Sequence, residues 1–382
     1  MTAVVRYGPF ISPPEISNVV IEGVRIDRGR QDFTSLVSSN RASFQILYDS
    51  SAGTFDPTTL ELGKFVLIQY ETPAGFNLFG GVVTDLSFNK DTAQVTAVSD
   101  GLSRLGRGTF AHALRDGYVW LALTDLYGDF SAQLYRSGGA PGLVYSMNAT
   151  QLVSIAASGN DSGIAVLQQL AASAPNSFLF EGLSGQLTFY DESYFRPSTW
   201  PVAPVTLNAD EIVDDWNLTK TIGEKVNRAE VTYNSGTAVD EDLLDQNNFG
   251  LFGSTVTTYL TDLSDAEQIA ERTLANLTDP GWQISAITIP VHTLSTARQN
   301  VIVPLGVGQL VDIPELYPGI PTRYVIQGIS DNLGQTRFER TLYLADWTLF
   351  RPAERWDDVD AALEWQDVDV SVTWADLVRE WI

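Results

Sequence analysis

Apolar and polar residues alternate along the first part of the chain in the pattern of a half-buried β-sheet. Gly23 interrupts the first of these runs, and Gly80 and Gly81 stand inside a later one, where glycine favours a bulge or a close backbone approach. Polar turns separate the runs. We therefore predict a first β-domain, residues 1–108, with strands at residues 19–27, 43–48, 65–70, 78–88 and 94–98.

The pattern changes in residues 109–204, which we predict to be an α+β middle domain. Asp116 and Ser162 each precede apolar residues with helical spacing, so each is predicted to begin a helix. The short apolar runs 178–180 and 187–190 are typical of a β-hairpin. A cluster of prolines then indicates a boundary.

Residues 205–350 are again rich in strand patterns and are predicted to form a second β-domain. One helix is expected near 264–278, where Ser264 and Glu267 have the spacing of a capping box. The acidic segment 240–245 lacks the glycine and the final glutamate of an EF-hand, so we favour a solvated loop over a calcium site. Strands are expected at 226–233, 282–291, 309–313, 323–330 and 337–344.

The two β-domains share a layout. Each has a glycine before a strand, a second glycine after a proline-containing loop, and an aspartate that ends a hairpin strand; the residues are Gly63, Gly81 and Asp100 in the first domain and Gly308, Gly328 and Asp346 in the second. The match is one of spacing more than of identity. It indicates either a duplication, with two like β-domains per chain, or a coincidence.

Composition narrows the possible functions. The 382 residues exceed what one core usually serves, and 44% are hydrophobic against 18% charged, which is typical of a folded protein with several domains. No apolar run is long enough to suggest a membrane span. The formal charge of −24 opposes nucleic-acid binding, because phosphate contacts need Lys and Arg. An acidic surface past which DNA slides without binding is compatible with this charge.

The chain has few residues for catalysis or metal binding. It contains no cysteine and only two histidines, His112 and His292, each in an ordinary structural setting. No paired carboxylates for glycoside cleavage are recognisable. We therefore expect no enzyme activity, no catalytic residue, no metal and no cofactor.

The last segment, residues 351–382, is a tail rich in Trp and Asp. Its four tryptophans are Trp356, Trp365, Trp374 and Trp381, and they cannot bury one another well in so short a segment. One interpretation is a tail that packs back on its own protein. The other is an anchor arm that docks its indoles into a neighbouring subunit or fibre, because aromatic anchors dominate interfaces.

Several segments match a known pattern: Ile26–Arg30, Ala42–Leu47, Gly53–Pro57, Leu78–Val83, Asp100, Lys225–Tyr233 and the helix Ala266–Leu277. Together they resemble minor tail proteins of long-tailed actinobacterial phages and, more widely, phage tail-hub proteins. These include the baseplate hub of contractile tails and the N-terminal part of tail-associated lysins. The resemblance covers about residues 15–350, and no catalytic signature anchors it.

The resemblance implies a homotrimer at the tip of a virion tail, made in the host cytoplasm. Two tube-like β-barrel domains per chain would form a pseudo-hexameric ring, with the α/β middle region and the short C-terminal tail outside them. The ring would join a distal tail protein or tail-tube ring to a central fibre or other tail-tip proteins. The tape-measure protein would be a further partner, and DNA would pass through without specific binding.

A virion receptor-binding protein that recognises host cell-wall carbohydrate is the alternative. Such a protein is expected to carry a terminal lectin-like domain, and few residues follow the hub-like part. The peptidase or lysozyme region that often follows the hub in this family is likewise expected to be absent or on another chain.

Overall fold

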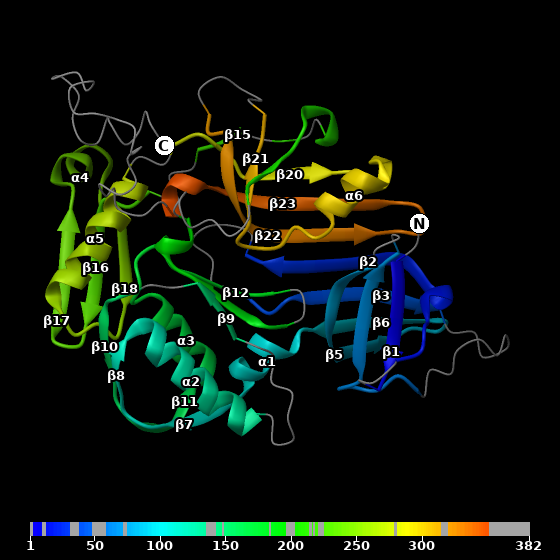
Figure 1. Ribbon diagram of the computed structural model, residues 1–382, viewed down its shortest axis with the longest axis horizontal. Helices are drawn as coiled ribbons and strands as arrows, with labels where there is room; N and C mark the ends of the chain where they lie inside the picture. Colours follow the sequence, from blue (N-terminus) through cyan, green and yellow to red (C-terminus); the bar gives the residue numbers. More distant parts are fainter. Residues whose placement is uncertain are drawn as a thin grey trace.

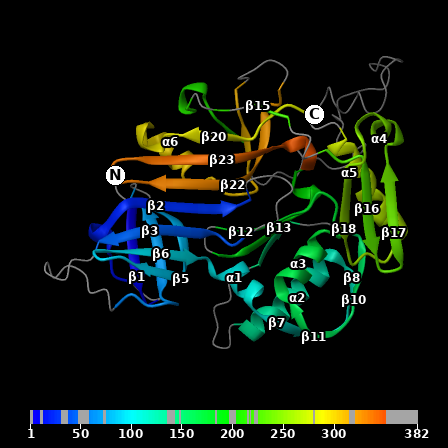
Figure 2. The same cartoon turned by 180° about the vertical axis from the view of Figure 1, so that it is seen from behind.

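The computed structural model describes most of the chain, namely residues 3–9, 13–30, 38–47, 59–71, 75–134, 143–146, 149–182, 185–195, 203–213, 216, 218–220, 225–278, 281–314 and 320–350. The fold is mainly β and is built on one sheet of eleven strands. Smaller sheets and six α-helices among the described residues surround it (Figures 1 and 2). None of the helices in these ranges is long and apolar enough to cross a membrane.

The first sheet module contributes six strands in the order β1-β4-β5-β6-β3-β2, and every neighbouring pair is antiparallel. Alternation places every second residue of β4 in the core, so that Val66, Ile68 and Tyr70 are buried. The strands are β1 (Ala3–Gly8), β2 (Val20–Gly29), β3 (Arg41–Leu47), β4 (Phe65–Tyr70), β5 (Phe76–Phe88) and β6 (Thr92–Val98).

The second sheet module continues the same sheet. Its central strand β22 pairs with β21 and with β23, and β23 also pairs with β20. The short strand β14 lies parallel to β21. The strands are β14 (Val205–Thr206), β20 (Ala286–Ile289), β21 (Leu310–Asp312), β22 (Arg323–Leu333) and β23 (Phe338–Asp346), and helix α6 (Thr296–Ile302) connects β20 to β21.

The middle region forms three small sheets and two longer helices. Helices α2 and α3 pack against each other beside the sheets (Figure 1). The elements are α1 (Asp100–Arg107), β7 (Thr109–His112), β8 (Arg115–Tyr118), α2 (Val119–Leu134), β9 (Leu143–Ser146), β10 (Leu152–Ile155), β11 (Ser158–Ser162), α3 (Gly163–Ala171), β12 (Phe178–Glu181) and β13 (Leu187–Tyr190).

An α/β unit lies between the strands of the second module in the sequence. Its three-stranded sheet has the order β17-β16-β18, and α5 packs on β16 and β17. The unit consists of β16 (Arg228–Tyr233), β17 (Gly236–Glu241), α4 (Leu243–Phe249), β18 (Gly253–Thr257) and α5 (Leu263–Leu277). Strands β15 (Leu218–Thr219) and β19 (Gln283–Ile284) pair where the chain enters and leaves it.

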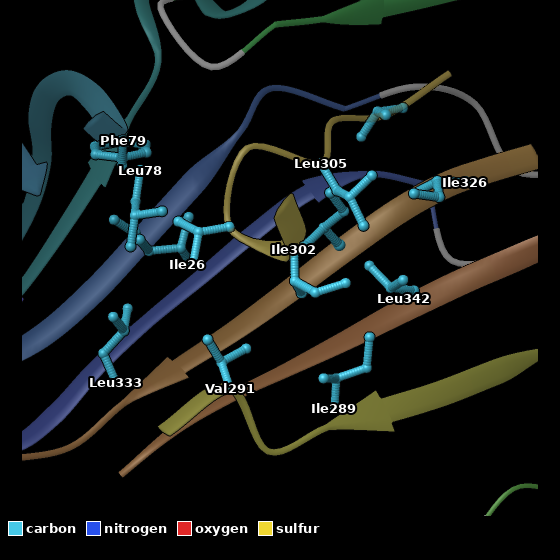
Figure 3. Close-up of a cluster of buried hydrophobic side chains, with 14 of the residues drawn as sticks. Ile26, Leu78, Phe79, Ile289, Val291, Ile302, Leu305, Ile326, Leu333 and Leu342 are labelled. Atoms are coloured by element: carbon cyan, nitrogen blue, oxygen red, sulfur yellow. The ribbon is translucent and has the colours of Figure 1, made fainter. Parts of the chain in front are cut away.

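Two hydrophobic cores hold the chain together. The first is shared by both sheet modules: Ile26 and Leu78 from the first module pack in one cluster with Ile289, Ile326 and Leu342 from the second (Figure 3). The second core joins the middle region to the α/β unit, because the buried residues of α2 and α3 and those of α5 belong to it. The boundaries 1–108, 109–204 and 205–350 stay a prediction.

The structure confirms the mainly β class with α+β insertions and corrects several details. Gly23 lies inside β2, in agreement with the predicted strand 19–27, and the ladder to β3 shifts register between Ile21 and Val24, where the apolar run is interrupted. Asp116 lies in β8 and is not a helix cap; the helix begins at Val119. Ser162 is the N-cap of α3, as predicted. The helix expected from Ser264 is α5, whose N-cap is Asp262.

The expected tube-like β-barrels are not closed within one chain. Among the described strands the sheet path ends at β1 on one side and at β14 on the other. The outer edge of β1 is covered by its own chain, since the Tyr7 amide donates to the Pro14 carbonyl and the Ile16 amide to the Val5 carbonyl. The two modules therefore form one continuous sheet.

Candidate functional site: the seam between the two sheet modules

The two modules meet along one antiparallel ladder between β2 and β22, which we call the seam. It pairs Val24 with Leu333 at one end and Gly29 with Gly328 at the other. Strand β21 occupies the remaining part of the same edge of β22, where it pairs with residues 323–325. Strand β22 therefore joins its own module and the first module along a single edge, as the adjacent β2 and β22 ribbons in Figure 1 show.

Equivalent hydrogen bonds show that the modules repeat the same meander. In the first, the Gly63 amide donates to the Val83 carbonyl, and the Val83 amide donates to the Lys64 carbonyl. In the second, the Gly308 amide donates to the Ile326 carbonyl, and the Ile326 amide donates to the Gln309 carbonyl. Both glycines have a positive φ, 80° and 85°. Strands β4-β5-β6 therefore correspond to β21-β22-β23.

A shared bulge fixes the register of this correspondence. The ladder between β5 and β6 shifts between Val83 and Asp85, and the ladder between β22 and β23 shifts between Ile326 and Gly328. Gly328 is thus equivalent to Asp85. The sequence-based match of Gly328 with Gly81 was wrong by four residues, because both glycines follow a proline-containing loop but only hydrogen bonds define the register.

A buried charge cluster crosses the seam. Asp331 on β22 is fully buried and forms ion pairs with Arg28 of β2 and Arg340 of β23. The bonds between Arg340 and Asp331 are 2.7 Å from Nε to Oδ1 and 2.9 Å from Nη2 to Oδ2. Arg340 Nη1 also donates to the carbonyls of Ile302 and Val303 at the end of α6, at 2.7 Å each. Arg28 Nη1 donates to the Leu78 carbonyl at 3.1 Å.

Burial acts on the pKa of Arg28 and on that of Asp331. It lowers the pKa of Arg28 to about 10, although the charge of Asp331 opposes the shift. Burial by itself raises the pKa of Asp331, but the charges and hydrogen bonds of Arg28 and Arg340 outweigh it, so this pKa lies below its ordinary value. Arg28 and Asp331 are therefore ionised at neutral pH, and the contacts of the cluster connect β2, β22, β23 and α6.

Glycines allow the two backbones to approach at the end of the seam. Gly29 has a φ of +71°, and a Cβ at this position would lie 2.3 Å from the Gln327 carbonyl oxygen. A Cβ on Gly328 would lie 2.1 Å from the Arg30 carbonyl oxygen. Real Cβ atoms do not make such contacts, so the seam requires glycine on both strands.

A second buried carboxylate fastens the first module to the middle region. Glu181, on β12, accepts hydrogen bonds from the amides of Asn40, Gly101 and Leu102 at 3.0, 2.9 and 3.1 Å and from the Ser99 hydroxyl. Burial raises the pKa of Glu181, and these donors oppose the shift. The carboxylate therefore satisfies amides at the start of α1 that the helix itself leaves open.

Replacing Glu181 by alanine is expected to loosen the start of α1. The Gly101 and Leu102 amides would lose their acceptor in a buried site, at a cost of about 1–2 kcal/mol. Hydrogen exchange followed by mass spectrometry should show faster exchange of residues 100–103. The control is Glu267→Ala, at an exposed position on α5. Unchanged protection of α1 in the Glu181 variant would contradict this role.

The two histidines bind neighbouring polar groups in structural settings. His112 Nε2 lies 3.0 Å from Asp161 Oδ2, and its Nδ1 lies 3.3 Å from the Ala113 carbonyl oxygen. A Ser-His-Asp arrangement would need a hydroxyl at that second position. His292 Nδ1 lies 3.1 Å from the Phe338 carbonyl oxygen.

The acidic segment 240–245 is not a loop. Asp240 and Glu241 end β17, Asp242 caps α4 by accepting a hydrogen bond from the Asp245 amide at 2.9 Å, and Asp245 pairs with Lys225. Within the described ranges, no group of three or more His, Cys, Asp or Glu side chains is placed to hold a metal ion. The candidate interface residues Trp356, Trp365, Trp374 and Trp381 lie outside the described residues.

Known proteins of similar structure place this fold among tail proteins. No protein-family model and no curated protein matches the sequence. A 43 kDa tail protein of prophage MuSo2 from Shewanella oneidensis is similar over 92% of this chain and 100% of its own, with a TM-score of 0.63 at 11% identity. A tail protein from Neisseria meningitidis MC58 gives the same coverage and TM-score at 14% identity.

A third similar structure is the E. coli c3393 protein, a component of the type VI secretion system that is described as structurally similar to the T4 bacteriophage tail proteins gp27 and gp5. It has a TM-score of 0.50 at 12% identity, over 91% of this chain and 79% of its own. At such identities the likeness establishes the fold. The chain therefore has the fold of prophage tail proteins.

Proposed function

We propose that this chain is a structural tail-hub protein, three copies of which form a pseudo-hexameric ring at the tip of a phage tail. The observation that carries the proposal is the repeat: two modules with the same bulged meander, joined edge to edge in one sheet. Three such chains supply six like modules around an axis. The ring would repeat, between chains, a junction like the one that β2 and β22 make within the chain.

The ring would connect a sixfold-symmetric partner to a threefold-symmetric one. Its six modules would match the hexameric distal tail protein or tail-tube ring, and its three chains would match a trimeric central fibre. Closure would also cover sheet edges, which otherwise expose unpaired backbone groups. The tail protein neighbours support this assignment, since they share the fold over nearly the whole chain.

The charge of the chain suits a channel for DNA. With a net charge of −24, the surface repels phosphates and gives DNA and the tape-measure protein a path without specific binding. The tail 351–382 is proposed to be an anchor arm whose tryptophans dock into a neighbouring subunit or fibre. This reading gives the chain a mechanical role and no catalytic one.

A mass measurement in solution tests the ring. Native mass spectrometry of the full chain is expected to give three times the 41.9 kDa monomer mass. Residues 1–350, measured in parallel, should still form the trimer if the tail binds only other proteins. A stable monomer that sediments with bacterial cell walls would contradict the hub and support a receptor-binding protein.

A further inference from the structure

Helix α4 exposes its apolar residues to solvent. None of its residues is buried. Leu243, Leu244 and Phe249 are 61%, 73% and 61% exposed, and Leu251 just beyond the helix is 63% exposed. Single exposed apolar residues are ordinary, but four large ones within nine positions form an unusual concentration for a surface that faces only water. We call these four residues the α4 surface.

Two polar residues of the same segment, Asp245 and Gln246, contact the rest of the protein and hold the segment in place. Asn227, on the segment leading into β16, is fully buried. Its Nδ2 donates to Asp245 Oδ2 at 2.8 Å and to the Gly250 carbonyl at 2.7 Å, while its Oδ1 accepts from the Phe252 amide at 2.7 Å. Gln246 Nε2 donates to the Asn227 carbonyl at 2.9 Å. This network fixes the apolar residues on the outside.

Lys225 also helps to attach helix α4 to the rest of the unit. Its Nζ lies 2.8 Å from Asp245 Oδ1 and also donates to the Thr278 carbonyl at the end of α5. The same ammonium lies 5.0 Å from the centre of the Phe249 ring. The helix is therefore held at both ends, and the exposed side chains cannot turn inward without breaking these partly buried hydrogen bonds.

The α/β unit that carries α4 is acidic. Residues 225–278 contain nine acidic and three basic side chains. The basic residues are already engaged: Lys225 pairs with Asp245, Arg228 with Glu230 and Glu241, and Arg272 with Glu192. The unit therefore has an excess of six negative charges, which favours a cationic partner.

We propose that the α4 surface is a docking site for a cationic amphipathic segment of another polypeptide. Apolar residues of the partner would cover Leu244 and Phe249, and its Lys or Arg side chains would face Asp240 near the end of β17. Charge opposes the tail of the same chain as the occupant, because residues 351–382 also contain nine acidic and three basic residues. The α4 unit lies at the outer end of the molecule, away from the seam (Figure 1), so this site does not overlap the seam.

A defined probe tests the site on the full chain. We expect a synthetic amphipathic Leu/Lys helix to bind the unmodified protein, with an affinity that weakens as salt rises. The double variant Leu244→Ser with Phe249→Ser keeps every charge and should bind the peptide at least tenfold more weakly. The matched control is Leu62→Ser, which removes a leucine that is 64% exposed in the first module and should leave binding unchanged. A Leu/Glu helix of the same pattern should not bind.

Other occupants give distinct results. Equal peptide binding by the double variant, or equal loss in the Leu62 variant, would overturn the site as non-specific charge attraction. Direct binding of a synthetic peptide of residues 351–382 to a chain that lacks this tail, lost in the double variant, would identify the tail as the occupant and overturn the proposal. A change in oligomeric mass of the double variant would identify a second copy and overturn it as well. The ring itself is tested by the mass of the unmodified chain, so the two proposals can fail separately.

Discussion

The Asp331→Ala chain is expected to be less stable than the unmodified protein by about 3–5 kcal/mol, the range for breaking a buried ion pair by removing one partner. The substitution would leave Arg28 and Arg340 buried, 4% and 0% exposed, without their shared carboxylate. It would also remove the ion pairs that link the side chains of β2, β22 and β23 at the seam. Urea unfolding followed by tryptophan fluorescence measures the change as a lower midpoint.

A control for Asp331 exists in the same sheet. Asp312 on β21 pairs with Arg323 of β22 at 2.7 Å, but both side chains are about a third exposed. Asp312→Ala should therefore cost no more than about 1 kcal/mol, as for other solvated pairs. If Asp312→Ala and Asp331→Ala lowered the free energy of unfolding equally, burial of the ion pair at the seam would make no extra contribution to stability.

The same cluster predicts a direction for the pH dependence. The pKa of Asp331 is lower in the folded chain than in the unfolded chain, so the folded state holds its proton less tightly. Its contribution is fully present above the unfolded-state pKa of about 3.9 and is lost as the pH falls through the folded value. The stability difference between the unmodified chain and Asp331→Asn should therefore shrink in acid. A difference that grew in acid would contradict this assignment.

Gly328→Ala is expected to open the seam at the end where Gly29 pairs with Gly328. The added methyl would meet the Arg30 carbonyl oxygen at 2.1 Å, and that atom belongs to the backbone, so relief requires the strands to separate. We expect a loss of about 3 kcal/mol, the upper part of the usual range for overpacking. Differential scanning calorimetry would record it as a lower melting temperature.

Gly306 provides the comparison for Gly328. It lies in the second module, and a Cβ there would have no atom within 4 Å. Gly306→Ala should change stability by less than about 1 kcal/mol in either direction. If the Gly328 variant melted like the Gly306 variant, the backbone approach at the seam would not limit stability.

Local patterns were sufficient to predict most strands of the sheet. The alternation of residues 43–48 and 65–70 reflects strands with one buried face, and the structure has β3 and β4 there. The repeat was also visible, because a glycine with positive φ precedes the equivalent strands β4 and β21. The register of the repeat could not be predicted from the sequence. The bulge that aligns Val83 with Ile326 is defined by hydrogen bonds between strands, and local patterns do not show these.

The seam and the α4 surface could not be predicted from local patterns. Arg28 and Asp331 are 303 residues apart, and nothing near either residue marks the other as its partner. Segment 240–245 looked like a solvated acidic loop because its carboxylates dominate the pattern. The segment instead leads into a helix, which Asn227 holds in place from 18 residues before Asp245 by donating hydrogen bonds to the Asp245 carboxylate and to the Gly250 carbonyl.

The pairing of β2 with β22 has a consequence for synthesis on the ribosome. On the edge of β2 opposite β3, residues 24–29 pair with residues 328–333, so this ladder cannot form until residues 328–333 have emerged. Until then β2 has only β3 beside it, and its other edge is open to pairing with a second nascent chain. Slow elongation or a truncated product should therefore favour aggregation through the N-terminal part, which a chaperone that shields strand edges would counter.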